Sequence, residues 1–282
     1  MDKRIAVIAD RLGWEEKRLL ESAADYGLEM EWINDASLLL GASQTTALDP
    51  FGLTMVRSRS YTRGGLLATM AEASGIRTLN TSTAIQLCEN KLLTRAELHR
   101  AGVPVPDFRL VLSRKDFNAA VEALPMPLVL KPVFGGMGKR VTLIRDADIA
   151  PSVYDYVEDL GHAFEQACLM EPYLGGDSIR CLVVGDEIVA AAEFESAGVD
   201  WRSNAALGNA NRALPHREDV VDLVDQVIKV LGPGIYGVDL FATPAGLVVN
   251  EVNHAPGYRG VETATGTDVS AAICRYLKGV LQ

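Results

Sequence analysis

The first eighty residues alternate short apolar runs with segments of helical spacing. Residues 5–9 form a continuous apolar run, as in a buried parallel strand, and residues 14–26 have helical spacing with a charged face. Further strands are predicted near 29–33, 54–56 and 75–80, with a helix around 64–73. This alternation predicts a small open α/β domain.

A second unit starts near Thr81. Asn90 is placed to cap a helix running to about residue 101, which Gly102 ends. A strand over 108–112 precedes a helix opened by Ser113, with Asp116 three residues on in a capping-box-like start. Two strands, 128–131 and 140–144, then flank a glycine-rich segment, which predicts a hairpin.

The last part of the chain predicts antiparallel strands and two helices. The strands cover 168–172, 179–184, 187–194, 236–242 and 246–252, and the helices 217–231 and 267–280. We therefore divide the chain into residues 1–88, 89–167 and 168–282.

Composition narrows the class of protein. Apolar residues make up 48% and charged residues 23%, which is typical of a globular chain. A net charge of −10 argues against bulk binding to nucleic acid or anionic membranes. The start lacks the features of a signal peptide, and no apolar stretch approaches membrane-spanning length. Four scattered cysteines are expected as buried thiols in a reducing cytoplasm.

The glycine-rich stretch VLKPVFGGMGKRV (129–141) is a candidate phosphate-binding loop. Glycines let backbone N–H groups approach a phosphate closely. The Walker pattern is absent, because Arg140 follows Lys139 where a hydroxyl is required and no helix is predicted directly after the loop. Taken alone, the stretch is equally compatible with a plain β-turn carrying a surface lysine.

Three oxygen-bearing side chains interrupt two apolar strands near the C-terminus. Glu251 and Asn253 are two residues apart and share one face of a strand, and Asp239 lies on the adjacent predicted strand. Carboxylate and amide oxygens suit magnesium. We favour this metal site over a solvated sheet face, which does not explain carboxylates within apolar strands.

Several weaker signals allow a functional or a structural interpretation. Arg202 and Asn204 share a face if extended, and would suit an anion or oxyanion. The segment that starts at Glu171, at a strand end, could bind an adenine edge through backbone groups, but by itself this signal is too generic to count. The arginines at 57, 59 and 63 form either a solvated stretch or an anion site. His254 is expected to shape the site rather than act as a base.

In this order, the segments resemble the ATP-grasp ligases. The resemblance is to the group containing the ribosomal S6 glutamate ligase RimK and the carrier-protein ligases LysX and ArgX. It covers nearly the whole chain. Its marks are NKLLT (90–94), VLKPVFGGMGK (129–139), IRCLVVGDEIVAA (179–191), WRSNAALG (201–208), GVDLF (237–241) and NEVNHAPGYRGVETATGTDV (250–269).

The resemblance implies an α/β and α+β protein with the three-lobed ATP-grasp fold. The three ranges above become an N-terminal α/β domain, a central α+β lobe with a phosphate flap, and a C-terminal α+β lobe. Implied nucleotide contacts are Lys91, Lys131, Gly135, Gly136, Met137, Gly138, Lys139, Glu171, Pro172, Tyr173, Leu174 and Asp177. Implied magnesium ligands, for two ions, are Asp239, Glu251 and Asn253; implied catalytic residues are Arg180, Arg202 and Asn204.

Two departures from the family pattern concern the phosphate and substrate contacts. Relatives usually read D-I-R where this chain has Ser178-Ile179-Arg180, and Asp177 lies one place early. A basic residue expected near 194 is replaced by the segment 193–195, EFE. Substrate contacts are expected at Arg57, Arg63, Gly257, Tyr258, Arg259 and Gly260, with Arg259 pairing a carboxylate of the incoming amino acid.

The resemblance therefore implies a cytoplasmic ATP-dependent carboxylate–amine ligase that works through an acyl phosphate. The leading expectation joins α-aminoadipate or glutamate to a glutamate carboxylate on a small acidic carrier protein or peptide, in a dimer or tetramer. Alternatives are RimK-like glutamate ligation to a protein or peptide, a peptide ligase of secondary metabolism, and a non-catalytic nucleotide-binding module.

Overall fold

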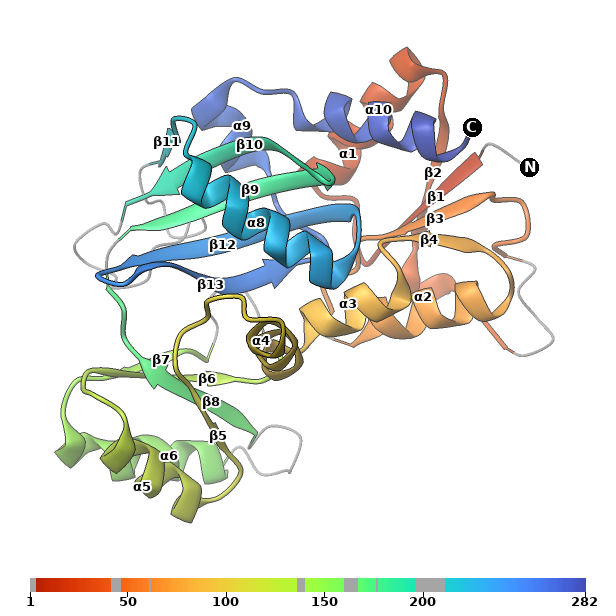
Figure 1. Ribbon diagram of the computed structural model, residues 1–282. Helices are drawn as coiled ribbons and strands as arrows, with labels where there is room; N and C mark the ends of the chain where they lie inside the picture. Colours follow the sequence, from red (N-terminus) through yellow and green to blue (C-terminus); the bar gives the residue numbers. More distant parts are fainter. Residues whose placement is uncertain are drawn as a thin grey trace.

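The computed structural model describes residues 4–41, 47–60, 62–135, 140–159, 167–175, 177–195 and 211–282. Within these ranges the chain forms three sheets, arranged in an N-terminal, a central and a C-terminal lobe (Figure 1). The mixture of helices and sheets agrees with the α/β and α+β architecture expected from the sequence. The described residues contain no helix long and apolar enough to cross a membrane.

The N-terminal sheet is parallel, with strand order β2-β1-β3-β4. Alternate residues of β1 face opposite layers. Ile5 and Val7 pack with helix α1, whereas Ala6 and Ile8 pack toward α2 and α3. The elements are β1 (Arg4–Ala9), α1 (Trp14–Ala23), β2 (Glu29–Asn34), β3 (Leu53–Val56), α2 (Arg63–Ala73), β4 (Arg77–Leu79) and α3 (Ser82–Glu89). This open α/β lobe confirms the alternation predicted from the sequence.

Helix α4 (Lys91–Arg100) leads into the central sheet, and Asn90 caps it as predicted, accepting a hydrogen bond from the Leu93 N–H at 3.1 Å. The sheet is antiparallel with order β5-β8-β6-β7. Phe117 and Tyr154 pack two helices together beneath it, with ring centroids 4.7 Å apart. The elements are β5 (Arg109–Val111), α5 (Arg114–Ala123), β6 (Leu128–Pro132), β7 (Thr142–Ile144), α6 (Ala150–Asp159) and β8 (Cys168–Pro172).

Strand β8 corrects one detail of the sequence interpretation. The sequence interpretation groups residues 168–172 with the C-terminal lobe. The strand instead pairs with β5 and β6 of the central sheet, where its apolar residues complete the core over α5 and α6. The chain enters the C-terminal lobe only after β8.

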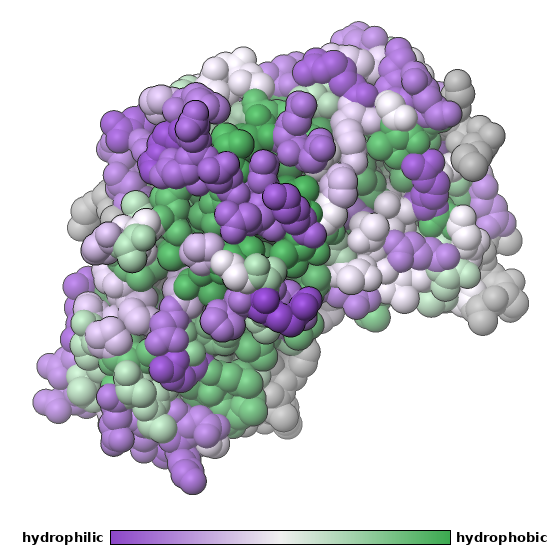
Figure 2. Space-filling model, in the orientation of Figure 1, coloured by the Kyte–Doolittle hydropathy of each residue, from purple (hydrophilic) through white to green (hydrophobic). Residues whose placement is uncertain are grey.

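The C-terminal sheet is antiparallel with order β11-β10-β9-β12-β13. Helix α8 packs six buried apolar residues against one face and exposes Asp222, Asp225 and Lys229 to solvent, where Figure 2 shows hydrophilic and hydrophobic surface interleaved. The elements are β9 (Ser178–Gly185), β10 (Glu187–Phe194), β11 (Asn211–Ala213), α8 (Glu218–Leu231), β12 (Gly234–Thr243), β13 (Gly246–Asn253), α9 (Arg259–Thr265) and α10 (Val269–Val280).

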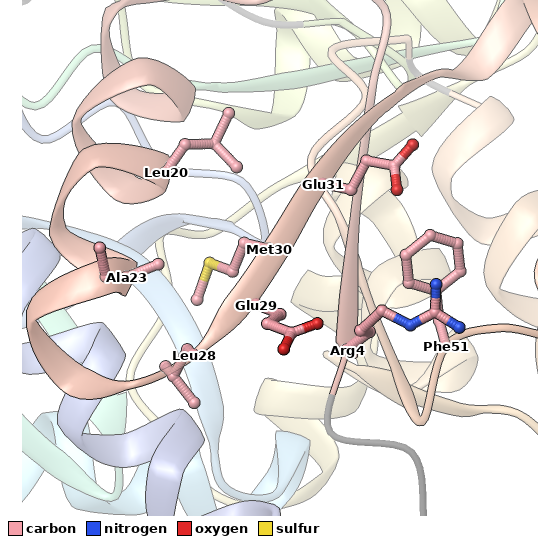
Figure 3. A pocket seen from close by; sticks show the side chains of 9 residues that line it. Arg4, Leu20, Ala23, Leu28, Glu29, Met30, Glu31 and Phe51 are labelled. Carbon is pink, nitrogen blue, oxygen red and sulfur yellow. The ribbon is translucent and has the colours of Figure 1, made fainter.

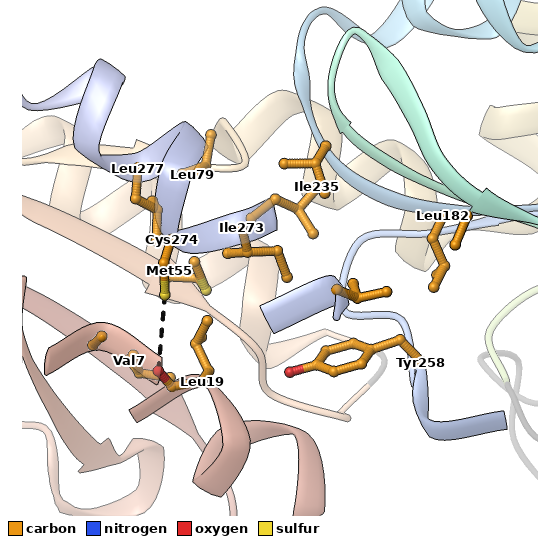
Figure 4. Close-up of a cluster of buried hydrophobic side chains, with 14 of the residues drawn as sticks. Val7, Leu19, Met55, Leu79, Leu182, Ile235, Tyr258, Ile273, Cys274 and Leu277 are labelled. Carbon is orange, nitrogen blue, oxygen red and sulfur yellow. Dashed lines mark hydrogen bonds between the residues drawn. The ribbon is translucent and has the colours of Figure 1, made fainter. Parts of the chain in front are cut away.

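One continuous core joins the N-terminal lobe to the C-terminal sheet. Helix α10 lies between them, and its Ile273, Cys274 and Leu277 contact side chains from both sides (Figure 4). Polar contacts cross the same junction: the Asn80 side chain accepts from the Ile235 N–H at 2.6 Å and donates to the Ile235 carbonyl at 2.8 Å. The lobes are thus packed together like one domain.

The four cysteines are free and buried, which confirms that part of the prediction. Burial raises the pKa of the Cys168 thiol to about 11 and that of Cys181 to about 12. A thiol is nucleophilic only as the thiolate, so none of these groups is suited to covalent catalysis near neutral pH.

Candidate active site

Arg180, Asp239 and Glu251 lie side by side on neighbouring strands of the C-terminal sheet. Asp239 on β12 is opposite Arg180 on β9 and opposite Glu251 on β13. Arg180 donates two hydrogen bonds to Asp239, through Nε to Oδ1 and Nη2 to Oδ2, each 2.7 Å long. Such a two-point guanidinium–carboxylate contact fixes both side chains.

The donor set fits the magnesium expected from the sequence. Asn253 extends the same face of β13 and donates to Asp239 Oδ2 at 3.4 Å. Two carboxylates and an amide oxygen are the hard ligands that magnesium prefers. Among the described residues no group of three or more His, Cys, Asp and Glu side chains is close enough together to hold a metal ion, so the set expected from the sequence consists of two carboxylates and the Asn253 amide.

Burial and mutual attraction set the pKa values of Asp239 and Arg180. Burial raises the pKa of Asp239, and the adjacent Arg180 guanidinium opposes that rise. The Asp239 charge in turn raises the pKa of Arg180, so the arginine stays cationic. The site thus holds a fixed positive charge beside its carboxylates.

Lys91 connects the glycine-rich segment to the sheet face that carries Glu251. Its ammonium contacts the Gly135 carbonyl and lies 3.5 Å from Glu251 Oε1, and its backbone N–H donates to the Val133 carbonyl at 3.0 Å. Lys91 is the first residue of α4, so the capping hydrogen bond of Asn90 also fixes the backbone from which the Lys91 side chain extends. The structure therefore brings Lys91 and Gly135 together, as expected.

Lys131 and Glu171 form a buried ion pair between β6 and β8. Burial opposes ionisation of Glu171, but Lys131 and Arg95 together outweigh it and lower its pKa. The pKa of Lys131 is also lowered, because burial and Arg95 disfavour its charge more than Glu171 favours it. The Glu171 side chain is thus committed to basic partners, whereas the sequence interpretation considered only its backbone.

The sequence interpretation missed Arg95 and Asn250. Arg95 lies 3.0 Å from Glu171 Oε2, and Lys131 Nζ lies 3.2 Å from Asn250 Oδ1. One signal was available: Arg95 follows Lys91 by four residues, which places both on one face of α4.

The segment after Glu171 joins the central and C-terminal sheets. Pro172 ends β8, and Tyr173 donates its N–H to the Pro127 carbonyl at 2.8 Å. Leu174 is partly exposed, and Asp177 directly precedes β9. This connection places the four residues at the boundary between two lobes, where the ATP-grasp resemblance expects a nucleotide.

Several predicted site residues lie outside the described residues. They are Gly136, Met137, Gly138 and Lys139 of the glycine loop, and Arg202 and Asn204. The two strands that flank the loop do pair as the predicted hairpin, with Leu128 opposite Ile144.

The arginines of the RSRSYTR stretch contact the protein's own carboxylates. Arg57 is buried, binds Glu16 Oε1 at 2.8 Å and donates to the Pro256 carbonyl at 3.0 Å. Arg59 pairs with Glu15 at 3.2 Å, and Arg63 with Asp35 at 2.9 Å. These contacts favour a structural role over the substrate contacts expected for Arg57 and Arg63, since each charge is already compensated.

The Gly257–Gly260 turn divides its two side chains between core and surface. Tyr258 is buried, and its hydroxyl donates to the Glu15 carbonyl at 2.9 Å. Arg259 is exposed, with its guanidinium 5.5 Å from the centre of the Trp14 ring. Tyr258 is therefore a packing residue, and Arg259 is the member of the pair that solvent and ligands can reach.

The two departures from the family pattern occupy defined positions. Ser178 is the first residue of β9 and is opposite Phe194 and Phe241. Glu193 faces Arg212 across β10 and β11, and their side chains are 2.6 Å apart. A basic group thus does stand at this end of the sheet, supplied by Arg212 from the next strand.

A cavity of about 440 Å³ lies elsewhere, between α1 and β2 of the N-terminal lobe. Its lining includes Arg4, Leu20 and Phe51, and three consecutive residues of β2, Glu29, Met30 and Glu31 (Figure 3). The chemistry described above does not involve this cavity.

Comparison with known proteins agrees with this geometry. Residues 88–277 match the model of the RimK-like ATP-grasp domain, and residues 5–87 that of the LysX preATP-grasp domain. Glutamate–LysW ligase ArgX of Sulfurisphaera tokodaii is 29% identical over 278 residues, and alpha-aminoadipate–LysW ligase LysX of the same organism is 28% identical over 279 residues. The alignments cover 98% and 97% of this chain, and 98% of each relative.

A solved structure shares the arrangement of lobes. The RimK domain protein ATP-grasp from Sphaerobacter thermophilus superimposes with a TM-score of 0.80 at 26% sequence identity, covering 97% of this chain and 98% of the other. The matched domain spans well over half of the chain and includes every carboxylate and basic residue of the site. This chain belongs to the RimK-like ATP-grasp family and is an ATP-dependent ligase.

Proposed function

We propose that the protein joins the α-amino group of an amino acid to a glutamate carboxylate on a small carrier protein. The incoming amino acid is α-aminoadipate or glutamate, as in the names of the LysX and ArgX relatives. The observation that carries the proposal is the convergence of Lys91, Lys131, Arg180 and the Asp239–Glu251 carboxylates between two lobes. Similarity to those relatives over nearly the full chain supports the substrate class.

The reaction has two steps. The acceptor carboxylate attacks the γ-phosphorus of ATP, which forms an acyl phosphate and releases ADP. The amine nitrogen then attacks the acyl carbon, loses a proton, and expels inorganic phosphate as the amide forms. Both steps place negative charge on phosphoryl and carbonyl oxygens, so cationic groups held in position supply most of the catalysis.

The described residues divide this work. Lys91 and Lys131 bind phosphate oxygens, and Arg180 neutralises the transferred phosphoryl group. Asp239, Glu251 and Asn253 would hold magnesium, which when bound supplies further charge neutralisation at the phosphates. Arg202, Asn204 and the glycine loop complete the proposed site, with Glu171 to Leu174 and Asp177 beside the nucleotide.

Arg259 is our proposed contact for a carboxylate of the incoming amino acid. Its guanidinium is exposed at the start of α9 and steadied over Trp14, so its donors remain open to a ligand. We expect Arg259→Ala to raise the KM for the amino acid with little change in the KM for ATP. Unchanged KM for the amino acid would remove this contact.

We place the enzyme in the cytoplasm and expect a dimer or tetramer. Four free, buried cysteines suit a reducing compartment. The acidic net charge disfavours docking of an acidic carrier by bulk attraction, and the paired arginines of the 57–63 stretch do not provide a free basic patch. Carrier docking therefore depends on local contacts near the site.

ADP release from Mg-ATP tests the proposal directly. The assay runs a panel of amino acids with and without a carrier protein ending in glutamate. Release that needs both the carrier and one amino acid would establish the carrier-ligase function. Release with free amino acids or peptides alone would indicate a peptide or poly-glutamate ligase. ATP binding without release in any combination would favour a non-catalytic nucleotide-binding module.

A further inference from the structure

Three charged side chains and one asparagine form a buried cluster where four elements meet. Arg95 comes from α4, Lys131 from β6, Glu171 from β8 and Asn250 from β13. The residues Arg95, Glu171 and Lys131 are 2%, 5% and 7% exposed. Burying three ionisable groups is costly unless each is paired, so their mutual geometry requires an explanation.

Arg95 ties the central lobe to the C-terminal sheet. Its Nε and Nη2 atoms donate to the Asn250 carbonyl at 3.2 and 2.8 Å, and Nη2 also donates to Asn250 Oδ1 at 3.2 Å. Asn250 is the residue skipped by the pairing of β12 with β13, where Asp239 is opposite Glu251 but Leu240 is opposite Val249. A bulge leaves its extra residue outside the hydrogen-bond ladder of the sheet, and here Arg95 donates hydrogen bonds to the carbonyl of that residue.

Glu171 is shared between two cations. Lys131 contacts its Oε1 atom, and Arg95 lies 3.0 Å from its Oε2 atom. The same two cations also share Asn250, since Lys131 Nζ lies 3.2 Å from Asn250 Oδ1. The cluster therefore has one more cation than it needs to neutralise Glu171.

We infer that Arg95 is a positioning residue that compensates Glu171 when Lys131 turns from this carboxylate to a nucleotide phosphate. The inference rests on the proposed function, in which Lys131 binds ATP phosphates. Without Arg95, release of Lys131 would leave a buried carboxylate unpaired, which is strongly unfavourable. With Arg95 in place, Glu171 keeps one ionic partner throughout, and Asn250 stays fixed beside the magnesium-binding residue Glu251.

The test compares Mg-ATP affinity, measured by calorimetry, in four variants of the full-length protein. Arg95→Met keeps the length of the side chain but removes its charge, and we expect ATP to bind about tenfold more weakly or worse. Arg95→Met/Glu171→Gln removes the carboxylate that then retains Lys131, so most of the lost affinity is expected to return. Arg95→Lys keeps the positive charge but lacks the planar guanidinium that donates from two nitrogens, and it is expected to bind ATP better than Arg95→Met.

Arg100→Met is the matched control on the same helix. The Arg100 side chain is 75% exposed and pairs with Glu97, three residues earlier on the same helix. We expect its removal to leave ATP affinity unchanged. Thermal unfolding of every variant separates loss of binding from loss of fold, and if Arg95→Met does not fold, the recovery of fold and ATP binding in the double variant carries the test.

Three results would overturn the inference. The first is an Arg95→Met variant that matches the wild type in ATP affinity, and the second is a double variant that binds ATP as weakly as Arg95→Met; either result would make Arg95 a purely structural contact. Arg95→Lys binding no better than Arg95→Met would show that the charge is irrelevant. Failure of the wild type itself to bind Mg-ATP would instead overturn the proposed function on which the inference rests.

Discussion

Arg180 and Asp239 show how a single pair of residues links stability to chemistry. The two side chains share two hydrogen bonds of 2.7 Å and are largely shielded from solvent, with 28% and 15% of each side chain exposed. In the proposed reaction, a charge held this firmly would stabilise the phosphoryl group without reorganisation. Removing either partner leaves the other charge poorly solvated.

Arg180→Met should therefore lower stability and activity together. We expect the free energy of unfolding to fall by about 2 kcal/mol, since a charged hydrogen-bonded partner is lost. We expect the turnover number for ADP release to fall about a hundredfold or more, as for loss of a group that binds transition-state charge. Urea unfolding and steady-state kinetics measure the two effects.

Arg180→Lys is the control for that variant. It retains the positive charge but loses the two-point contact, so both effects should be intermediate. If stability falls in Arg180→Met while turnover is unchanged, Arg180 is a structural residue and its place in the site is wrong.

Glu89 provides a test based on pH. It is buried at the end of α3, where both carboxylate oxygens accept from the Gly65 N–H at 3.2 Å. Burial raises its pKa to about 7 from an ordinary value of 4.5. Between these values the folded protein binds more protons than the unfolded chain, so the contribution of Glu89 to stability is present below pH 4.5 and is lost as pH rises through 7.

Glu89→Gln should expose this dependence by difference. A neutral amide resembles the protonated carboxyl, so the free energies of unfolding of the variant and the wild type should be similar at pH 4.5. By pH 8 the free energy of unfolding of the variant should exceed that of the wild type by more than it does at pH 4.5. Urea unfolding across this range measures the difference, and a difference that stays constant with pH would contradict the raised pKa.

At the scale of elements, the position of Lys91 depends on the start of α4. The helix begins directly after Asn90, whose side chain accepts from the Leu93 N–H, and Lys91 is the first residue inside it. Arg95 follows one turn later on the same helix. One capping residue thus positions two basic groups that reach the site.

Asn90→Ala should weaken both the helix and nucleotide binding. Loss of a capping side chain costs about 1 kcal/mol of stability. Because Lys91 leaves the helix at this end, we also expect Mg-ATP affinity to fall several-fold, on the order of the same 1 kcal/mol. Thermal unfolding and calorimetry measure the two quantities.

Ser113→Ala is the matched control for the cap at Asn90. Ser113 caps α5 by accepting from the Asp116 N–H at 3.2 Å, and α5 lies on the central sheet away from the site. It should lose similar stability but keep its ATP affinity. Equal loss of ATP affinity in both variants would mean that the cap at Asn90 acts only through overall stability.

At the scale of the whole molecule, the N-terminal lobe fixes the end of β13, the strand that carries two of the proposed magnesium ligands. Asn80, which is 2% exposed, bonds to both backbone groups of Ile235 and donates to the His254 carbonyl at 3.3 Å. His254 directly follows Asn253 on the chain. A contact between lobes therefore fixes the backbone next to a proposed metal ligand.

Asn80→Ala should destabilise the protein by about 1–3 kcal/mol, because it leaves buried backbone groups of Ile235 unpaired. Asn80→Asp keeps the acceptor for the Ile235 N–H but loses the donor to the Ile235 carbonyl. Its loss of stability should therefore also be substantial, but it should come from the carbonyl alone. Urea unfolding measures both. A loss below about 0.5 kcal/mol in Asn80→Ala, the range of ordinary surface substitutions, would show that the other contacts between the lobes hold them together without Asn80.

The sequence by itself determined the local structure and the types of chemistry. Apolar spacing predicted the N-terminal α/β alternation and the strands of the C-terminal sheet, and the capping residues Asn90 and Ser113 located two helix starts. These features depend on neighbouring residues, which a linear reading captures. The carboxylates within apolar strands likewise predicted that polar partners would meet there, because polar groups are placed in a core only with partners; Asp239 does pair with Arg180, whereas the magnesium site stays a prediction.

Only the tertiary structure decided which partners meet. Strand β8 joins the central sheet by pairing with strands that lie far away in the chain. The arginines at 57, 59 and 63 form ion pairs with carboxylates on other elements. The spacing of Arg95 from Lys91 places both on one face of α4, but only the folded chain brings the bulge at Asn250 and the carboxylate of Glu171 beside Arg95. Such contacts depend on how distant segments pack, and no spacing within one segment encodes them.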